Sequence, residues 1–216
     1  MVRSLTSAVL MVWAAAVVLG QPGYAGEPKP LIGVFMDFDV ARPTSLALEA
    51  MEHEVEAIMK PTGLGVGWRW LKDNRGREAF PGLVVVRFKG RCEVGSWGEA
   101  PEPGKTVTLG STLVEGGRAL PFSEVECEQV RKTLPYTNAG TCEQEKQSAL
   151  GRAMGRVLAH ELYHALAHTT GHAVEGLAKA SQSFRDLVTG PLDFGRAEST
   201  AIRQGVAGTG AVFSFK

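Results

Sequence analysis

The sequence has few cysteines, no excess of either charge and no repeats, and each of these absences excludes a class of protein. Its 216 residues include only three cysteines, none of them in a C-x-x-C pair, which excludes a scaffold built on disulfides. Neither sign of charge is in excess, because 23 Lys and Arg residues balance 23 Asp and Glu residues. The chain therefore lacks the field that nucleic acids or anionic membranes require, and we expect no nucleic-acid partner. It has no internal repeat, and its 44% apolar content is that of an ordinary folded protein.

Long apolar runs are also scarce, and the one that exists lies at the N-terminus. Residues 5–19 are apolar apart from Thr6 and Ser7, follow the basic Arg3, and lead to the small-residue pattern Gly23-Tyr24-Ala25. A membrane-spanning helix needs about 20 apolar residues, so residues 1–25 are predicted to be a secretory signal peptide cleaved after Ala25. Because no second such run follows, we expect the mature protein to be secreted or periplasmic and not bound to a membrane.

Export to an oxidising compartment changes what the cysteines indicate. Cys92, Cys127 and Cys142 all lie in the mature chain, so one disulfide and one free thiol are expected. Of the three pairings we favour Cys92–Cys127, because each of these residues ends a strand-like run and neighbouring strand ends can bring Cα atoms within bridging distance. The alternative interpretation is three small buried side chains.

The hydrophobic periodicity changes along the mature chain. Alternating and β-branched runs in the N-terminal half predict strands, with one helix that begins at Pro43-Thr44-Ser45. From Glu143 to His168 the period becomes 3.6, and Thr169-Thr170-Gly171 is expected to end this long helix. The predicted strands are 31–40, 67–71, 83–88, 107–114 and 120–125, with a turn at 115–118 between the last two. Weaker helical stretches cover 176–188 and 196–204, and a Gly-rich tail, expected to be frayed, covers 205–216.

The residues that indicate chemistry are concentrated in the long helix. His160-Glu161-Leu162-Tyr163-His164 is an H-E-x-x-H motif. Residues four apart lie one above the other on a helix, so the two imidazoles can bind one ion. Glu161 is turned about 100° from His160, so it is expected to act on a water at the metal as general base, and not to bind the metal itself. Four of the five histidines fall between His160 and His172, which packing does not require.

An H-E-x-x-H motif on a central helix, after a strand-rich half, resembles the zincin metallopeptidases. The resemblance implies a zincin-like α+β fold over residues 26–204, with a mostly antiparallel N-terminal sheet and a helix, a central active-site helix and a small helical C-terminal part. It also implies Zn²⁺ as cofactor and a peptide or protein as substrate. Within this family, metzincins have Gly three residues after the second His and a third His three residues later. This chain has Ala167 and Thr170 there, and no methionine after the motif to form a Met-turn.

The third metal ligand is inferred from geometry. His168 is nearest in sequence, but a helix rise of 1.5 Å per residue places it roughly 12 Å from His160 along the axis. His172 follows Gly171, which can adopt the left-handed conformation that ends a helix and reverses the chain. We therefore predict His160, His164 and His172 as the zinc ligands, with Glu175, Glu198 and His168 as the alternatives for the third position.

These residues lead to two interpretations of different classes. The first is a secreted zinc-dependent peptidase with Glu161 as general base and strand 83–88 or 107–114 lining the cleft. The alternative is a non-catalytic secreted zinc-binding module, in which a fourth ligand such as His168 or Glu175 closes the tetrahedron. A third interpretation, an enzyme that hydrolyses a non-peptide amide, is not distinguished from the peptidase by the sequence.

Other candidate groups carry weaker signals. Asp37 and Asp39 could form a carboxylate pair, but solvated side chains at a strand end are the simpler interpretation. Neither Cys127 nor Cys142 lies in a nucleophile signature. Tyr136 and Tyr163 are conceivable oxyanion donors, although Tyr163 is expected to point away from the ligand side of its helix.

Overall fold

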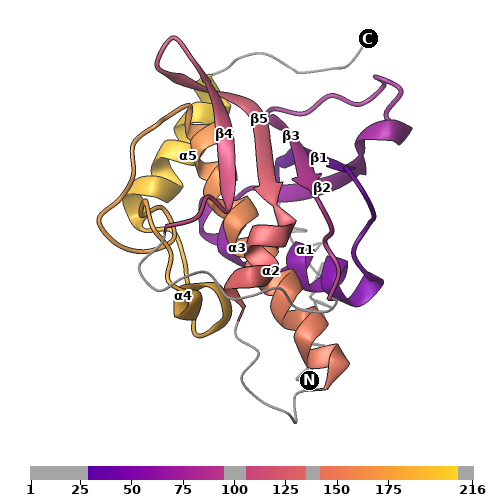
Figure 1. The fold of residues 1–216 in the computed structure, drawn as a ribbon. Helices are drawn as coiled ribbons and strands as arrows, with labels where there is room; N and C mark the ends of the chain where they lie inside the picture. The colour runs from indigo at the N-terminus through magenta and orange to yellow at the C-terminus, as the bar shows by residue number, and fades with distance from the viewer. Residues whose placement is uncertain (1–28, 95–105, 135–141, 209–216) are drawn as a thin grey trace, which may run out of the picture.

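The computed structural model describes residues 29–94, 106–134 and 142–208. The predicted signal peptide and residues 209–216 lie outside these ranges. Five strands of the described chain form one sheet in the order β2-β1-β3-β5-β4 (Figure 1). The strands are β1 (Leu31–Phe38), β2 (Gly65–Trp70), β3 (Leu83–Lys89), β4 (Gly110–Glu115) and β5 (Arg118–Glu126). The helices are α1 (Ser45–Met59), α2 (Cys127–Thr133), α3 (Glu143–Ala167), α4 (Phe184–Val188) and α5 (Arg196–Gly208), with 3-10 turns at Lys60–Thr62 and Leu71–Asp73.

The fold is α+β as predicted, but the sheet is mixed and mostly parallel. β2, β1, β3 and β5 run in one direction, and β4 pairs with β5 in the opposite direction. The prediction of a mostly antiparallel sheet is therefore wrong. Helix α1 provides the crossover that parallel pairing of β1 and β2 needs. The near-continuous apolar runs at residues 32–36 and 83–86 are typical of strands inside a parallel sheet.

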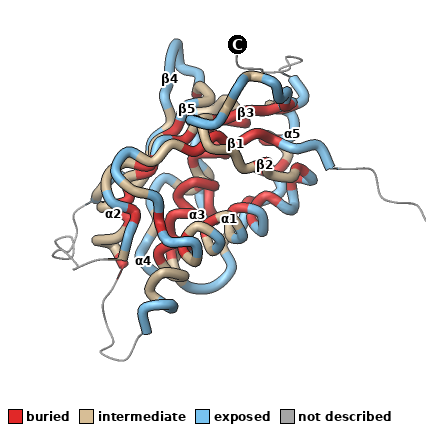
Figure 2. The backbone as a smooth tube through the Cα atoms, turned by 90° about the vertical axis from the view of Figure 1, so that its right-hand side faces the viewer, coloured by how far each residue is buried: buried red, intermediate tan, exposed pale blue. Residues whose placement is uncertain are grey.

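The main core lies between the sheet and the pair of helices α1 and α3. The buried residues gather between these layers in Figure 2. α1 begins where predicted, because the Thr44 hydroxyl accepts a hydrogen bond from the Ala47 backbone N–H. α3 approaches α1 closely at Gly151 and Gly155, where a side chain would collide with the α1 backbone. The inward side chains of the central strands complete this core: Ile32, Val34, Met36, Val84, Val86 and Phe88.

The C-terminal part differs from its prediction in three places. Only Phe184–Val188 is helical in the predicted stretch 176–188. α5 runs to Gly208 and not to residue 204, because Gly205 lies against the Leu166 backbone and Val206 is buried in the core. α2 was not predicted, since it is short and begins at the residue after β5.

The disulfide Cys92–Cys127 is present, with the two Cα atoms 4.9 Å apart. Cys92 follows β3, and Cys127 follows β5, which is the neighbour of β3 in the sheet. The predicted pairing is therefore confirmed, and for the predicted reason. Cys142 is an exposed free thiol. Among the described residues, no helix is long and apolar enough to cross a membrane.

Candidate metal centre

The motif residues lie near the C-terminal end of α3, where Glu161 is directed at β4 and the two histidines at the segment that follows the helix. His164 is 7% exposed and Glu161 is 5% exposed, whereas His160 is half-buried. Val157, one turn before Glu161, packs in the core at 4% exposure. α3 packs closely against α1 at Gly151 and Gly155, in the turns before the motif.

His172 reaches the other two histidines because the chain reverses after α3. α3 ends at Ala167, and His168 takes the left-handed conformation with φ of 52°. His168 is the only non-glycine residue with positive φ in the described chain, and Gly171 does not have positive φ. The predicted reversal therefore exists but begins at His168, and the expectation that Gly171 forms it is wrong.

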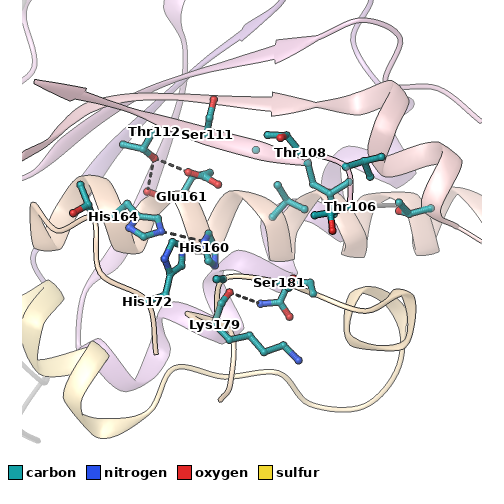
Figure 3. Close-up of a pocket in the computed structure, with 18 of the residues that line it drawn as sticks. Thr106, Thr108, Ser111, Thr112, His160, Glu161, His164, His172, Lys179 and Ser181 are labelled. Carbon is teal, nitrogen blue, oxygen red and sulfur yellow. Dashed lines mark hydrogen bonds between the residues drawn. The ribbon is translucent and has the colours of Figure 1, made fainter. Parts of the chain in front are cut away.

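The structure brings His160, His164 and His172 together (Figure 3). One potential ligand atom from each lies within 4.8 Å of the others. The Nε2 atoms of His160 and His164 are 3.1 Å apart. The Nδ1 atoms of these two rings point away from this centre, at 2.8 Å from the carbonyl oxygens of Leu177 and Thr169 respectively.

These contacts determine which nitrogen carries the proton. A carbonyl oxygen only accepts, so Nδ1 of His160 and of His164 must be the protonated nitrogen that donates to it. In the neutral rings both Nε2 atoms then carry lone pairs that face each other at 3.1 Å. Two nitrogen ligands of one tetrahedral zinc, each about 2.0–2.1 Å from the ion, are about 3.3 Å apart. The donor set and its backbone partners therefore fit a zinc ion.

The protonation of the histidines agrees with this geometry. Burial, together with the proximity of His164 and His172, lowers the pKa of His160 to about 4, against the opposing hydrogen bond to Leu177. Burial also lowers the pKa of His164. Both shifts favour the neutral imidazole, which is the form that binds metals.

Glu161 extends from α3 towards β4. Its Oε2 atom accepts a hydrogen bond of 2.7 Å from the Thr112 hydroxyl (Figure 3). Burial raises the pKa of Glu161 to about 7, and the hydrogen bond from Thr112 opposes this shift. A carboxyl group with such a pKa can take up and release a proton near neutral pH.

A cleft of about 870 Å³ lies over these residues. Residues 106–112 and 114 form one wall, and residues 169, 170, 172, 179–182 and 184 contribute to the other. His160, Glu161, His164 and Val157 lie on its floor. The histidine group therefore faces an open cleft and not the closed interior of the protein.

The remaining candidate residues lie elsewhere. The His168 ring is directed to the Ala119 carbonyl oxygen at 3.4 Å, and Glu175 is exposed. Glu198 lies near Tyr163. Burial raises the pKa of Tyr163, and the charge of Glu198 raises it further. The Tyr163 ring packs against Phe194 and does not line the cleft. None of the three alternative ligands joins the histidine group.

The other predicted groups give no second site. Asp37 pairs with Arg87 across the sheet, and no metal-binding group of the described residues includes Asp37 or Asp39. Cys127 is in the disulfide. Tyr136 lies outside the described residues.

Sequence reasoning missed the partners of the motif. Thr112 is 49 residues before Glu161, in a strand predicted only as a possible wall of the cleft. The carbonyl groups of Leu177 and Thr169 have no signal in the sequence, because every residue has one. Only the fold could identify these contacts.

Comparison with known proteins does not assign a family. No protein-family model matches the chain, and a search of curated proteins found no match.

Proposed function

We propose that this protein is a zinc-dependent peptidase in which His160, His164 and His172 bind the metal and Glu161 is the general base. The observation that carries the proposal is the pair of facing Nε2 atoms 3.1 Å apart, beside a buried carboxylate, on the floor of an open cleft. Lone pairs at this distance repel each other unless a cation lies near them. The buried carboxylate belongs to Glu161, the residue that the H-E-x-x-H motif predicts as the proton acceptor for a water at the metal.

The roles of the side chains follow from their contacts. The Leu177 and Thr169 carbonyl groups orient the two imidazoles, so that Nε2 of each ring is directed at one point. A bound zinc ion would supply Lewis acidity, which lowers the pKa of a water and polarises a peptide carbonyl. Glu161 would accept the proton of the attacking water and transfer it to the leaving nitrogen.

The three-residue group supports a catalytic site over a structural one. Structural zinc sites have four protein ligands, whereas catalytic sites have three and an open position. His168 and Glu175, the residues proposed to close the site, lie outside the group. Within the described chain, no fourth His, Cys, Asp or Glu joins the three histidines.

β4 is the strand on which a substrate could bind. It is the last strand in the sheet order, with β5 on one side, whereas β3 lies between β1 and β5. Of the two strands predicted to line the cleft, β4 is therefore suitable and β3 is not. We propose that an extended peptide adds to the edge of β4 that has no partner strand among the described residues, with its scissile bond over Glu161.

We also propose that the protein is exported. The Cys92–Cys127 disulfide is consistent with an oxidising compartment. The predicted signal peptide would direct the chain there.

The test uses the chain from residue 26 onward, loaded with one equivalent of zinc. We expect hydrolysis of a mixed fluorogenic peptide library, and we expect Glu161→Gln to reduce kcat by about 10²- to 10⁴-fold, as for loss of a general base. Bound zinc should stay near one equivalent in Glu161→Gln, since this carboxylate is not a ligand. Glu175→Gln is the matched control, because Glu175 is an exposed carboxylate outside the histidine group.

Two results would contradict the proposal. Wild-type activity in Glu161→Gln would remove Glu161 as the base. A zinc-loaded protein that cleaves nothing, and whose thermal stability falls steeply on metal removal, would favour the structural zinc module.

A further inference from the structure

Thr112 on β4 makes contacts that connect the sheet to the base of the proposed peptidase. Its Oγ1 atom lies 2.7 Å from Glu161 Oε2 and 3.3 Å from the Glu161 carbonyl oxygen (Figure 3). The same atom is 3.0 Å from Ser123 Oγ. Ser123 is 3% exposed and is the direct cross-strand partner of Thr112. The two hydroxyl groups thus stand side by side on the face of the sheet that covers α3.

The direction of these hydrogen bonds follows from counting protons. Thr112 has one hydroxyl hydrogen, and an ionised carboxylate only accepts. The shortest contact is the one to Glu161 Oε2, so the Thr112 hydrogen is donated there. Ser123 must then donate its own hydrogen to Thr112 Oγ1. The result is a chain of hydrogen bonds from Ser123 to Thr112 to Glu161, in which Ser123 restricts the rotation of the Thr112 hydroxyl.

The second carboxylate oxygen of Glu161 lies beside a residue without a side chain. A Cβ atom on Gly110 would be 2.8 Å from Glu161 Oε1 and 2.8 Å from Val157 Cγ1. Gly110 lines the cleft, as does Glu161. Thr112 therefore holds one oxygen, while the absence of a side chain at Gly110 leaves space next to the other.

The backbone of the hairpin sets the position of Thr112. β4 and β5 pair regularly from Gly110 to Thr112, and the register shifts between Thr112 and Val114. Such irregularities bend a strand and redirect its side chains. Thr112 is thus the last β4 residue before the register shift, and it still lies directly opposite Ser123 on β5.

We propose that Thr112, supported by Ser123, is a positioning residue that holds Glu161 Oε2 and leaves Oε1 as the oxygen that takes the proton. This inference rests on the proposed peptidase function. Thr112 acts through Glu161 and does not touch the reacting atoms. Without it, the Glu161 carboxylate rotates about its last bond, and the fraction of molecules with a correctly directed oxygen falls.

The experiment compares Thr112→Val, Thr112→Ser and Ser123→Ala with wild type, all zinc-loaded, on a peptide that the wild type cleaves. Thr112→Val keeps the size of the side chain and removes the hydroxyl. A hydrogen bond to a charged group corresponds to roughly 10- to 100-fold in rate, so we expect kcat to fall by that factor with KM nearly unchanged. Thr112→Ser retains the hydroxyl and should recover most of kcat, and Ser123→Ala should show a smaller loss than Thr112→Val.

The control is Thr189→Val, which removes an exposed threonine hydroxyl outside the cleft and should keep the wild-type kcat. Zinc content and thermal stability are measured for every variant. An unchanged kcat in Thr112→Val would overturn the inference while the peptidase function remained. Equal losses in Thr112→Val and Thr112→Ser, in parallel with lowered thermal stability, would also overturn it and assign Thr112 a purely structural role. A wild type with no activity on any peptide would instead refute the proposed function itself.

Discussion

Arg156 and Glu54, 102 residues apart in the sequence, form an ion pair in the interior, with 2.6 Å between Arg156 Nε and Glu54 Oε1. The Arg156 side chain is 3% exposed. Its other nitrogens donate to the carbonyl oxygens of Asp186, Thr189 and Gly190. Arg156 on α3 therefore connects α1 to residues 186–190. These residues follow the cleft-lining residues 179–182 and 184 in the chain.

Replacing Arg156 by Met should lower the free energy of unfolding by about 3–5 kcal/mol, because Glu54 and three carbonyl groups lose a buried partner. Arg152→Met is the matched control. Arg152 contacts the same carboxylate at 3.7 Å, but its side chain is 46% exposed, so its loss should cost about 0.5 kcal/mol. Urea unfolding of the two variants measures the difference. Equal costs would show that burial does not determine the contribution of Arg156.

The histidine geometry predicts which substitutions abolish zinc binding. His160→Ala, His164→Ala and His172→Ala should each lose most bound zinc after dialysis against a weak chelator, because each removes one of the three proposed ligands. His168→Ala should keep about one equivalent, since its ring faces the Ala119 carbonyl group. Elemental analysis of the dialysed proteins measures this directly. Wild-type zinc content in His172→Ala would exclude His172 from the site.

The reversal after α3 predicts an unusual response at His168. A left-handed residue with a side chain is strained, so His168→Gly should raise the free energy of unfolding by about 0.5–1 kcal/mol. His168→Val should lower it by more than this and reduce zinc binding, because a β-branched residue resists positive φ and the turn carries His172. Gly171→Val should leave zinc binding nearly unchanged, since Gly171 does not have positive φ. Thermal unfolding and zinc analysis test all three variants, and zinc loss confined to Gly171→Val would place the reversal at Gly171.

The contact between Lys179 and Asp186 predicts acid sensitivity near the cleft. The hydrogen bond from Lys179, followed by those from Ser183, lowers the pKa of Asp186 from 3.8 to about 2. A carboxyl group whose pKa is lower in the folded state stabilises the fold above its unfolded pKa. This contribution, about 1 kcal/mol after solvent screening, should disappear as the pH falls from about 4 to about 2.

Asp186→Asn isolates this effect. At pH 6 the variant should unfold at a lower urea concentration than wild type, and at pH 2 the two midpoints should converge. A difference that stayed constant between these pH values would show that the Asp186 carboxylate does not titrate in this way.

Much of the secondary structure could be predicted because it depends on local patterns. The apolar stripe from Leu150 to Leu166 predicted α3, and the H-E-x-x-H spacing placed His160 and His164 on one side of it. The Gly116-Gly117 turn also formed where predicted, with positive φ at both glycines. Strand direction was predicted wrongly. Alternation suits parallel and antiparallel pairs alike, and the short apolar runs that favour parallel pairing carry less weight than the crossover through α1, which only the fold shows.

The sequence by itself determined the spacing of His160, Glu161 and His164 on the helix, since helix geometry fixes it. The sequence also favoured the cysteine pair that forms, because both residues come after strand ends. Only the tertiary structure decided which side chains and carbonyl groups complete the site. The reversal at His168 depends on backbone conformation. The contacts of His160 with the Leu177 carbonyl group and of Glu161 with the Thr112 hydroxyl group join segments that are distant in the sequence. Such contacts arise when β4 and the segment after α3 pack on the two sides of one helix, and no local pattern records that packing.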